Sequence, residues 1–371
     1  MANPMSYAEY TRLHYDPDYP AARFIRKLAP IARTSTHERV PRNVIWPDAT
    51  RPIPHPLTPA PADKDDLSRF EGYDAIVITY TSAEAAALAA LLTPGWPIST
   101  WYEYRHKLQQ YTRIVTGPNA PFNSKDPRDA RYRHSLGLYF PCTIGRRRVL
   151  LLKSGLHLDY DSKVPGPIIP INKMLTEAIQ AVAPRLVITT GTGGGIGANV
   201  KLGDVIIAGK TLFDCKHQFK HESWARSPYK TTPVSARALG LMTTDLLQVN
   251  AARIATATPI PGRAVPKIWS GETTTIVSTD KFAFDTSSNK PFGLHGLGQV
   301  CDMGDATVGQ VMQRFKNIEW YAIRNASDPQ IPDADLTYEQ ADREAGEIYR
   351  DYGAFTTAAS VIATWAIIAA S

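Results

Sequence analysis

The sequence predicts an α/β fold: a single domain with a central mixed, mostly parallel β-sheet flanked by helices, preceded by a proline-rich N-terminal extension. Along most of the 371 residues, short runs of β-branched and aliphatic residues alternate with longer helix-forming segments. This alternation is typical of a sheet that helices cover on both faces. The chain is 43% hydrophobic and 20% charged, which is enough apolar material for one large core.

Prolines mark the extension, which we place at residues 1–72, before an α/β domain at 73–371. Seven of these prolines fall within 41–61. Because proline lacks a backbone donor and has a fixed φ, we expect a semi-rigid strap there and no regular element.

The first strand of the domain is expected at 74–81, where the run is apolar and rich in β-branched residues. The segment 82–92 behind it opens on a serine and continues with strong helix formers, which predicts a helix. The same two patterns recur further along the chain. The later strands are expected at 148–154, 186–191, 203–209, 273–279 and 320–327, and the later helices at 171–182, 306–315 and 356–370.

The positive charge is concentrated in one part of the chain. The formal net charge is +6, and residues 101–150 hold ten Lys and Arg against three Asp and Glu. This excess lies in a stretch, 95–147, that resembles an insertion between the first helix and the second strand. A nucleic-acid binder would spread basic residues over a whole face, so nucleic acid is not expected as a partner.

The cysteines, the histidines and the hydropathy of the chain indicate its compartment and whether it binds a metal or a membrane. The three cysteines are far apart and form no CxxC pair, which favours a reducing compartment. No signal-peptide order is found at the N-terminus and no apolar run reaches the roughly 20 residues that cross a bilayer, so we expect a cytoplasmic protein without membrane contact. His217 and His221 are four residues apart with no third ligand nearby, so neither a metal nor another cofactor is expected.

Glycines follow the strand expected at 186–191. Five of them lie between Gly191 and Gly197, and they allow a ligand to approach the backbone closely. The spacing is neither a P-loop nor a dinucleotide fingerprint. A nucleotide loop and a plain glycine-rich turn at the sheet edge both remain open.

Six segments in a fixed order carry a family resemblance. They are VITYTSAEAAAL, LLKSG, TTGTGGGIGANVKLGDVII, STDKF, VCDMGDATVGQV and IRNASDP. In this order the sequence resembles the nucleoside phosphorylase and nucleosidase superfamily, and within it the methylthioadenosine/S-adenosylhomocysteine nucleosidases most. The resemblance covers 73–371 and implies cleavage of an N-glycosidic bond.

The resemblance implies two catalytic carboxyl groups. Glu84 matches the glutamate that activates the attacking water, because a carboxylate within reach can accept its proton. Asp328 matches the aspartate that protonates or hydrogen-bonds purine N7, and Ser327 matches the serine that orients it. Without the resemblance, an acid at a helix N-terminus is the preferred interpretation of Glu84, and part of an Asp-Pro turn is the alternative for Asp328.

The resemblance also implies residues that contact the nucleoside. Phe282 matches the aromatic residue that lies against the purine. Thr192, Gly193 and Gly194 match the loop that lines the pocket. Met303 matches a methionine that packs on the sugar.

The sugar-binding segment departs from the family. The family reads VEMEAA, and this chain reads CDMGDA. Asp302 takes the place of the first glutamate, Gly304 replaces the glutamate that holds the sugar hydroxyls, and Asp305 lies one position further on. Either Asp305 reaches the ribose by a local shift, or this chain recognises the sugar differently.

The expected activity is that of a purine nucleosidase acting on a purine nucleoside or nucleotide. Threonine stands where the related phosphorylases carry a phosphate-binding arginine, which favours water over phosphate as the nucleophile. A purine nucleoside phosphorylase and a non-catalytic nucleotide-binding sensor remain the alternatives. The resemblance also implies a homo-oligomer.

The basic excess suggests an anionic substrate. Its phosphates would lie against Arg105, Lys107 or the run 146–148, because cations beside a cleft attract phosphate. A solvated basic face is the alternative.

Overall fold

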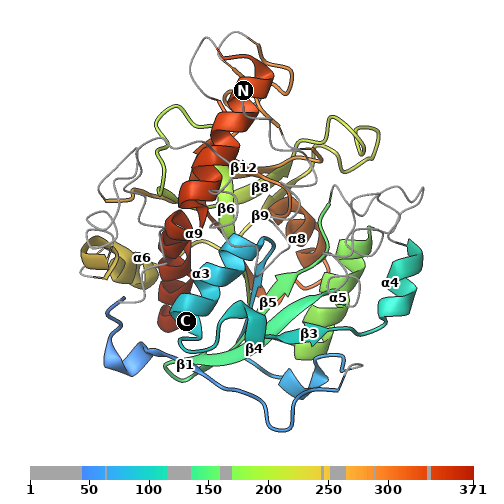
Figure 1. Ribbon diagram of the computed structural model, residues 1–371, viewed down its shortest axis with the longest axis vertical. Coiled ribbons are helices and arrows are strands. Elements are labelled where there is room, and N and C mark those ends of the chain that lie inside the picture. The colour runs from blue at the N-terminus through green and yellow to red at the C-terminus, as the bar shows by residue number, and fades with distance from the viewer. Residues whose placement is uncertain are drawn as a thin grey trace, which may run out of the picture.

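The computed structural model describes residues 44–62, 65–114, 135–158, 169–243, 246–250, 265–281, 283–286, 289–331 and 336–371. Within them, the strands form one mixed sheet with the order β1-β4-β5-β2-β6-β12-β11-β8-β9. Its centre is parallel: β2 (Ala75–Thr79) lies between β5 (Arg147–Ser154) and β6 (Leu186–Gly195), and β13 (Glu319–Pro329) pairs with β6. Figure 1 shows this arrangement.

Antiparallel pairs occur at the margins of the sheet, where β4 pairs with β5 and β8 with β9, and also next to its centre, where β12 pairs with β6 and β7 with β13. The sheet is therefore mixed, as the sequence predicts. The other strands are β1 (Pro52–Pro54), β3 (Tyr102–Tyr104), β4 (Gly137–Ile144), β7 (Val205–Ile207), β8 (Lys210–Phe213), β9 (Pro228–Lys230), β10 (Ile268–Trp269), β11 (Thr275–Ser278) and β12 (Val300–Asp302). The α-helices are α3 (Ser82–Leu92), α4 (Leu108–Ile114), α5 (Pro170–Val182), α6 (Ala236–Thr243), α8 (Asp305–Met312) and α9 (Tyr338–Ala370), and the 3₁₀ helices are η1 (Asp48–Thr50), η2 (Ser68–Phe70) and η3 (Ile98–Thr100).

Alternate residues of the central strands feed two apolar layers. In β2, Ile76 and Ile78 pack on the side of α5 and α8, whereas Ala75 and Val77 pack on the side of α3, α6 and α9. A strand buried on both faces must be apolar at every position, which explains the unbroken hydrophobic runs of the sequence. Figure 1 shows the long helix α9 beside α3, and these helices confirm the expected α/β layering.

The proline-rich extension contains a strand that the sequence does not predict. Pro52–Pro54 form β1, which pairs antiparallel with β4 at the sheet edge. Proline is tolerated on an edge strand because one side of the strand needs no ladder donor. The expectation of no regular element there is wrong for these three residues and for the short 3₁₀ helix η1 just before them.

The basic stretch at 95–147 is partly built into the sheet. Its last part is β4, in which Phe140 and Cys142 are fully buried, and β4 forms a hairpin with β5. Residues 115–134 of the stretch lie outside the described residues. Its described C-terminal part thus belongs to the core of the sheet.

The glycines that follow the strand expected at 186–191 continue this strand as part of β6. β6 extends to Gly195 because it stays paired with β13 as far as Pro329. A Cβ atom at Gly191 would overlap the Glu84 carboxylate, and one at Gly194 would overlap the Gln330 side chain. These glycines allow two neighbouring elements to touch the strand.

The C-terminal helix also differs from expectation in its length. The last helix is longer than the predicted 356–370 and begins at Tyr338, after a capping box between Thr337 and Gln340.

Among the described residues, no helix has the length and apolar character that a membrane span requires. The three cysteines are free and buried.

Candidate active site

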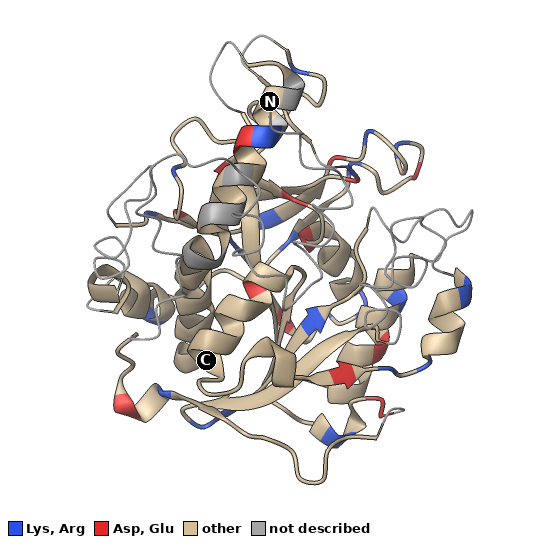
Figure 2. Cartoon of the chain, in the orientation of Figure 1, with Lys and Arg blue, Asp and Glu red and all other residues tan. Residues whose placement is uncertain are grey.

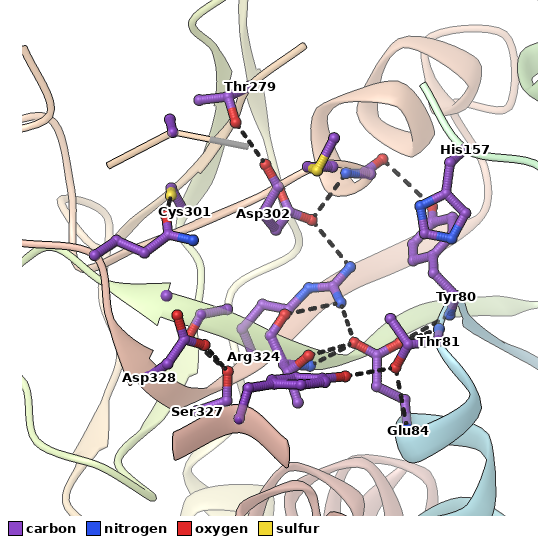
Figure 3. Close-up of a pocket in the computed structure, with 18 residues that line it drawn as sticks. Tyr80, Thr81, Glu84, His157, Thr279, Cys301, Asp302, Arg324, Ser327 and Asp328 are labelled. Atoms are coloured by element: carbon purple, nitrogen blue, oxygen red, sulfur yellow. Dashed lines mark hydrogen bonds and ion pairs between the residues drawn. The ribbon is translucent and has the colours of Figure 1, made fainter. Parts of the chain in front are cut away.

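A pocket lies at the carboxyl ends of the parallel strands β2, β6, β11 and β13, where α/β sheets commonly bind ligands. Figure 3 shows Glu84, Tyr80 and His157 on one side of it, Asp328 and Ser327 on the other, and Arg324 and Asp302 between them. The lining residues are Tyr80, Thr81, Glu84, His157, Thr192, Gly193, Gly194, Thr279, Ala283, Cys301, Asp302, Met303, Gly304, Arg324, Ser327, Asp328, Gln330 and Tyr349.

Glu84 is buried in the first turn of α3 and belongs to a capping box with Thr81. Its Oε2 accepts hydrogen bonds from the Thr79 hydroxyl at 2.8 Å and from the backbone N–H groups of Tyr80 and Thr81 at 2.9 and 2.8 Å. Its Oε1 accepts from the N–H and the hydroxyl of Thr192, at 2.7 and 2.8 Å.

These contacts determine the charge of Glu84. Burial by itself would raise the pKa of this carboxyl, but the Arg324 guanidinium and the backbone N–H groups outweigh it and lower the pKa to about 2. Glu84 is therefore a firmly held carboxylate at neutral pH, suited to stabilise a cation and only weakly basic.

Arg324 is a site residue that the sequence interpretation missed. It lies on β13, is 2% exposed, and donates from Nη1 to Glu84 Oε1 at 3.2 Å and to the Thr192 carbonyl at 3.3 Å. The guanidinium carbon of Arg324 lies 5.4 Å from the centre of the Tyr80 ring, in a cation–π contact. A signal was present, because an arginine within an otherwise apolar strand must be buried with acidic partners.

Asp302 and Asp305 are the other two acidic partners of Arg324. Asp302 lines the pocket, and its Oδ2 lies 3.0 Å from Arg324 Nη2. Asp305 binds Nε at 2.8 Å and Nη2 at 2.5 Å, is fully buried, and is not among the lining residues. The local shift that would bring Asp305 to a sugar is not seen, and we do not retain Asp305 as a ligand contact.

Tyr80 explains the glycine in the sugar-binding segment. A Cβ atom at Gly304 would lie 2.6 Å from both Cε2 and Cζ of the Tyr80 ring, and the Tyr80 hydroxyl donates to the Gly304 carbonyl at 3.3 Å. A glutamate at 304 would therefore require the Tyr80 ring to move from this position. The Tyr80 ring also packs against His157 in an edge-to-face arrangement, with the ring centres 5.3 Å apart.

Asp328 and Ser327 both reach the pocket although they are consecutive in β13. The register with β6 shifts between Ala326 and Asp328, which is a β-bulge. A bulge re-aims side chains that would otherwise point to opposite faces of the sheet. The Ser327 hydroxyl then donates to Asp328 Oδ1 at 2.6 Å, and Asp328 is 5% exposed.

The structure places the other sequence-predicted residues as follows. Thr192, Gly193, Gly194 and Met303 line the pocket. Phe282 lies outside the described residues. Besides Arg324, the lining residues that the sequence interpretation missed are Tyr80, Thr81, His157, Thr279, Ala283, Cys301, Gln330 and Tyr349.

The comparison with protein-family models decides the family. Residues 78–358, three quarters of the chain, match the model described as "Phosphorylase superfamily". The chain belongs to the phosphorylase superfamily. No curated protein matches it.

Solved structures similar to this superfamily member include two hydrolases. A 5'-methylthioadenosine/S-adenosylhomocysteine nucleosidase from Neisseria meningitidis, in complex with methylthio-immucillin-A, is 17% identical, with a TM-score of 0.46 over 81% of this chain and 100% of that one. The futalosine hydrolase of Helicobacter pylori is 16% identical, with a TM-score of 0.47 over 80% of this chain and 97% of that one.

The described basic residues of 95–147 lie away from the pocket. Arg105 pairs with Glu103, Lys107 lies 3.1 Å from a Glu177 carboxylate oxygen, and Arg147 lies 3.3 Å from one of Asp74. Figure 2 shows that basic and acidic residues are interspersed over the described part of the chain. Within the part of the stretch that the structure describes, no cation is placed to hold a phosphate in the pocket.

A metal centre finds no support in the described residues. They contain no group of three or more His, Cys, Asp or Glu side chains placed to hold an ion. The polar groups that line the pocket are carboxylates, hydroxyls, the His157 imidazole, the Cys301 thiol, the Gln330 amide and one buried guanidinium.

Proposed function

We propose that this pocket hydrolyses the N-glycosidic bond of a purine nucleoside or nucleotide. The observation that carries the proposal is the placement of two carboxyl groups, Glu84 and Asp328, on opposite sides of one pocket (Figure 3). Membership of the phosphorylase superfamily supports the reaction class.

Asp328 acts at the departing base. It donates a proton, or a hydrogen bond, to the purine, so that the electron pair of the breaking C–N bond remains on the base. The Ser327 hydroxyl fixes the orientation of the Asp328 carboxyl. Such help to a leaving group typically accelerates a reaction by roughly 10² to 10⁴-fold.

Glu84 acts at the sugar and the water. Its negative charge stabilises the cationic sugar that forms as the bond breaks. Its partner Thr192 lines the pocket and offers a hydroxyl through which a water is oriented. The water oxygen then bonds to the anomeric carbon and its proton leaves toward Glu84. A carboxylate of low basicity suffices, because bonding to the cationic carbon makes the water strongly acidic.

Water is favoured over phosphate because the pocket arginine is already committed. Among the described lining residues, Arg324 is the one arginine or lysine, and three carboxylates surround it. A phosphate dianion would have to compete with all three. This charge balance supports hydrolysis over phosphorolysis.

The test is to incubate the purified protein with adenosine, methylthioadenosine, AMP and ATP, each with and without phosphate, and to follow the free base by chromatography. Reactions in ¹⁸O-labelled water identify the nucleophile, because hydrolysis puts the label on the sugar. Release that requires phosphate, without label, would replace the proposal by a phosphorylase.

A second candidate is binding without turnover, which the low basicity of Glu84 and the glycine at 304 favour. The same panel separates it. Measurable binding of adenosine or AMP with no base released from any substrate would establish the sensor and refute the nucleosidase. The homo-oligomer is likewise part of the proposal, and light scattering after size exclusion tests it.

A further inference from the structure

Asp305 is a fully buried acid that is not among the residues lining the pocket. It begins helix α8, and its carboxylate spans Nε and Nη2 of Arg324. A pair of parallel bonds of this kind fixes the plane of a guanidinium as well as its position. Rotation of the Arg324 head is thereby prevented.

The other edges of the same guanidinium face the pocket. Nη1 donates to Glu84 Oε1 at 3.2 Å, and Nη2 lies 3.0 Å from Asp302 Oδ2. The backbone N–H of Asp305 also donates to Asp302 Oδ2 at 2.8 Å. Asp305 is therefore linked to both pocket carboxylates, although it does not itself line the pocket.

The cluster has more negative than positive charge. Three carboxylates, from Glu84, Asp302 and Asp305, surround one guanidinium, and all four side chains are at most 3% exposed. The buried Lys153 ammonium interacts with Glu84 as a second cation, so the carboxylates still outnumber the cations. An uncompensated charge at such depth is costly, and uptake of a proton by one carboxyl relieves the cost.

Asp302 is the group whose surroundings favour that proton. Burial first, and the neighbouring Asp305 carboxylate second, raise the pKa of Asp302 to about 7 against the opposing effect of Arg324. Glu84, by contrast, is held ionised. The titratable and charged groups around Asp302 are Arg324 from β13, Asp305 from α8, Tyr80 after β2, Glu84 from α3 through Arg324, and Cys301 from its own strand.

We infer that Asp305 is a positioning residue of this pocket: it fixes Arg324 against Glu84, and its charge makes Asp302 the carboxyl that exchanges a proton when a ligand binds. The inference rests on the proposed function only in its kinetic test, which requires that the protein turns over a substrate. Substrate binding and pH are thereby linked through a residue that touches no substrate.

The test is the pH dependence of kcat/KM for the best substrate of the panel, which reports ionisations of the free protein. The wild type is expected to show an inflection near pH 7 from Asp302. Asp305→Asn removes the negative charge that raises the pKa of Asp302 and keeps the Arg324 charge that lowers it. The inflection is therefore expected to move to lower pH by roughly one unit or more. Asp305→Glu keeps the charge and retains an inflection near neutrality.

A merely structural role gives a different result. If Asp305→Asn lowers kcat/KM by the same factor at every pH and leaves the inflection unmoved, the inference is overturned. Asp302→Asn is the second variant, because it leaves the Asp305–Arg324 pair in place, and it must abolish the inflection. Asp48→Asn, an exposed acid paired with Arg51, is the matched control with an unchanged profile.

Turnover is not required for the test. Calorimetry of adenine binding in two buffers of different ionisation enthalpy measures the protons exchanged as a function of pH. If no substrate is cleaved but this exchange is centred near pH 7 and shifts in Asp305→Asn, the inference stands and the proposed function falls. Proton exchange that is absent, or the same in both proteins, overturns the inference alone.

Discussion

Replacing Glu84 by glutamine tests how much the buried carboxylate stabilises the fold. A carboxyl whose pKa falls from 4.5 to about 2 on folding stabilises the folded state by roughly 3 kcal/mol above pH 5, since one pH unit corresponds to about 1.4 kcal/mol. The amide NH₂ of glutamine would also face a backbone N–H at one of the two oxygen positions, at a cost of about 1 kcal/mol or more. We expect Glu84→Gln to lower the free energy of unfolding at pH 7 by about 4 kcal/mol.

The pH dependence separates the charge from the shape of the side chain. A lowered pKa in the folded state stabilises above the unfolded value of 4.5, and this contribution is lost as the pH falls through about 2. At pH 3 the contribution of the charge should therefore have shrunk to about 1 kcal/mol.

The assay is urea unfolding followed by tryptophan fluorescence at pH 7, 5 and 3. Glu272→Gln, at an exposed position, is the control and should unfold like the wild type at each pH. A loss below about 1 kcal/mol at pH 7, or a loss that stays the same at pH 3, would refute the assignment of Glu84 as a strongly stabilised carboxylate.

Three further changes probe other contacts. Asp328→Asn should reduce base release by at least about 100-fold, and Ser327→Ala by about tenfold because one orienting hydrogen bond is lost; equal effects of the two would contradict the assigned roles. Gly304→Ala should destabilise the wild-type protein more than it destabilises the Tyr80→Ala variant. A double-mutant cycle of urea unfolding should give a coupling free energy of about 1 kcal/mol or more between the two positions. Additive effects would exclude the contact with the ring. Trp365 is fully buried and donates to the Thr50 carbonyl at 2.7 Å, so thermal or urea unfolding should show a loss of about 3–5 kcal/mol for Trp365→Ala and about 1–2 kcal/mol for Trp365→Phe.

Local patterns predict the central strands and helices well. The helix at 82–92 was predicted with both of its bounds, because its run of alanines and leucines is a local property, but its N-cap is Thr81 and not the serine that the sequence suggested. The strand at Pro52–Pro54 was not predicted, because its partner, β4, lies about 90 residues further along the chain. Pairing with a distant strand overrode the local preference of proline for an irregular strap.

The candidate site shows the same division. Asp328, Ser327, Thr192 and Glu84 were found from the sequence segments around them, and the structure brings them to one pocket. Arg324 was missed although it stands four residues before Asp328, because its importance arises from three carboxylates on other elements.

The order of apolar runs, helix formers and glycines was thus sufficient to establish the α/β fold, because each of these features depends on near neighbours. The carboxyl groups of the site were indicated only by the resemblance of whole segments to the family. Which way Asp302 and Asp305 point, how far the glycine strand extends, and why residue 304 has no side chain depended on folding. These properties arise where β2, β12, β13 and α8 meet around Arg324 and Tyr80. Charge balance and exclusion of overlapping atoms act between segments that are remote in the sequence, and only their packing brings those segments together.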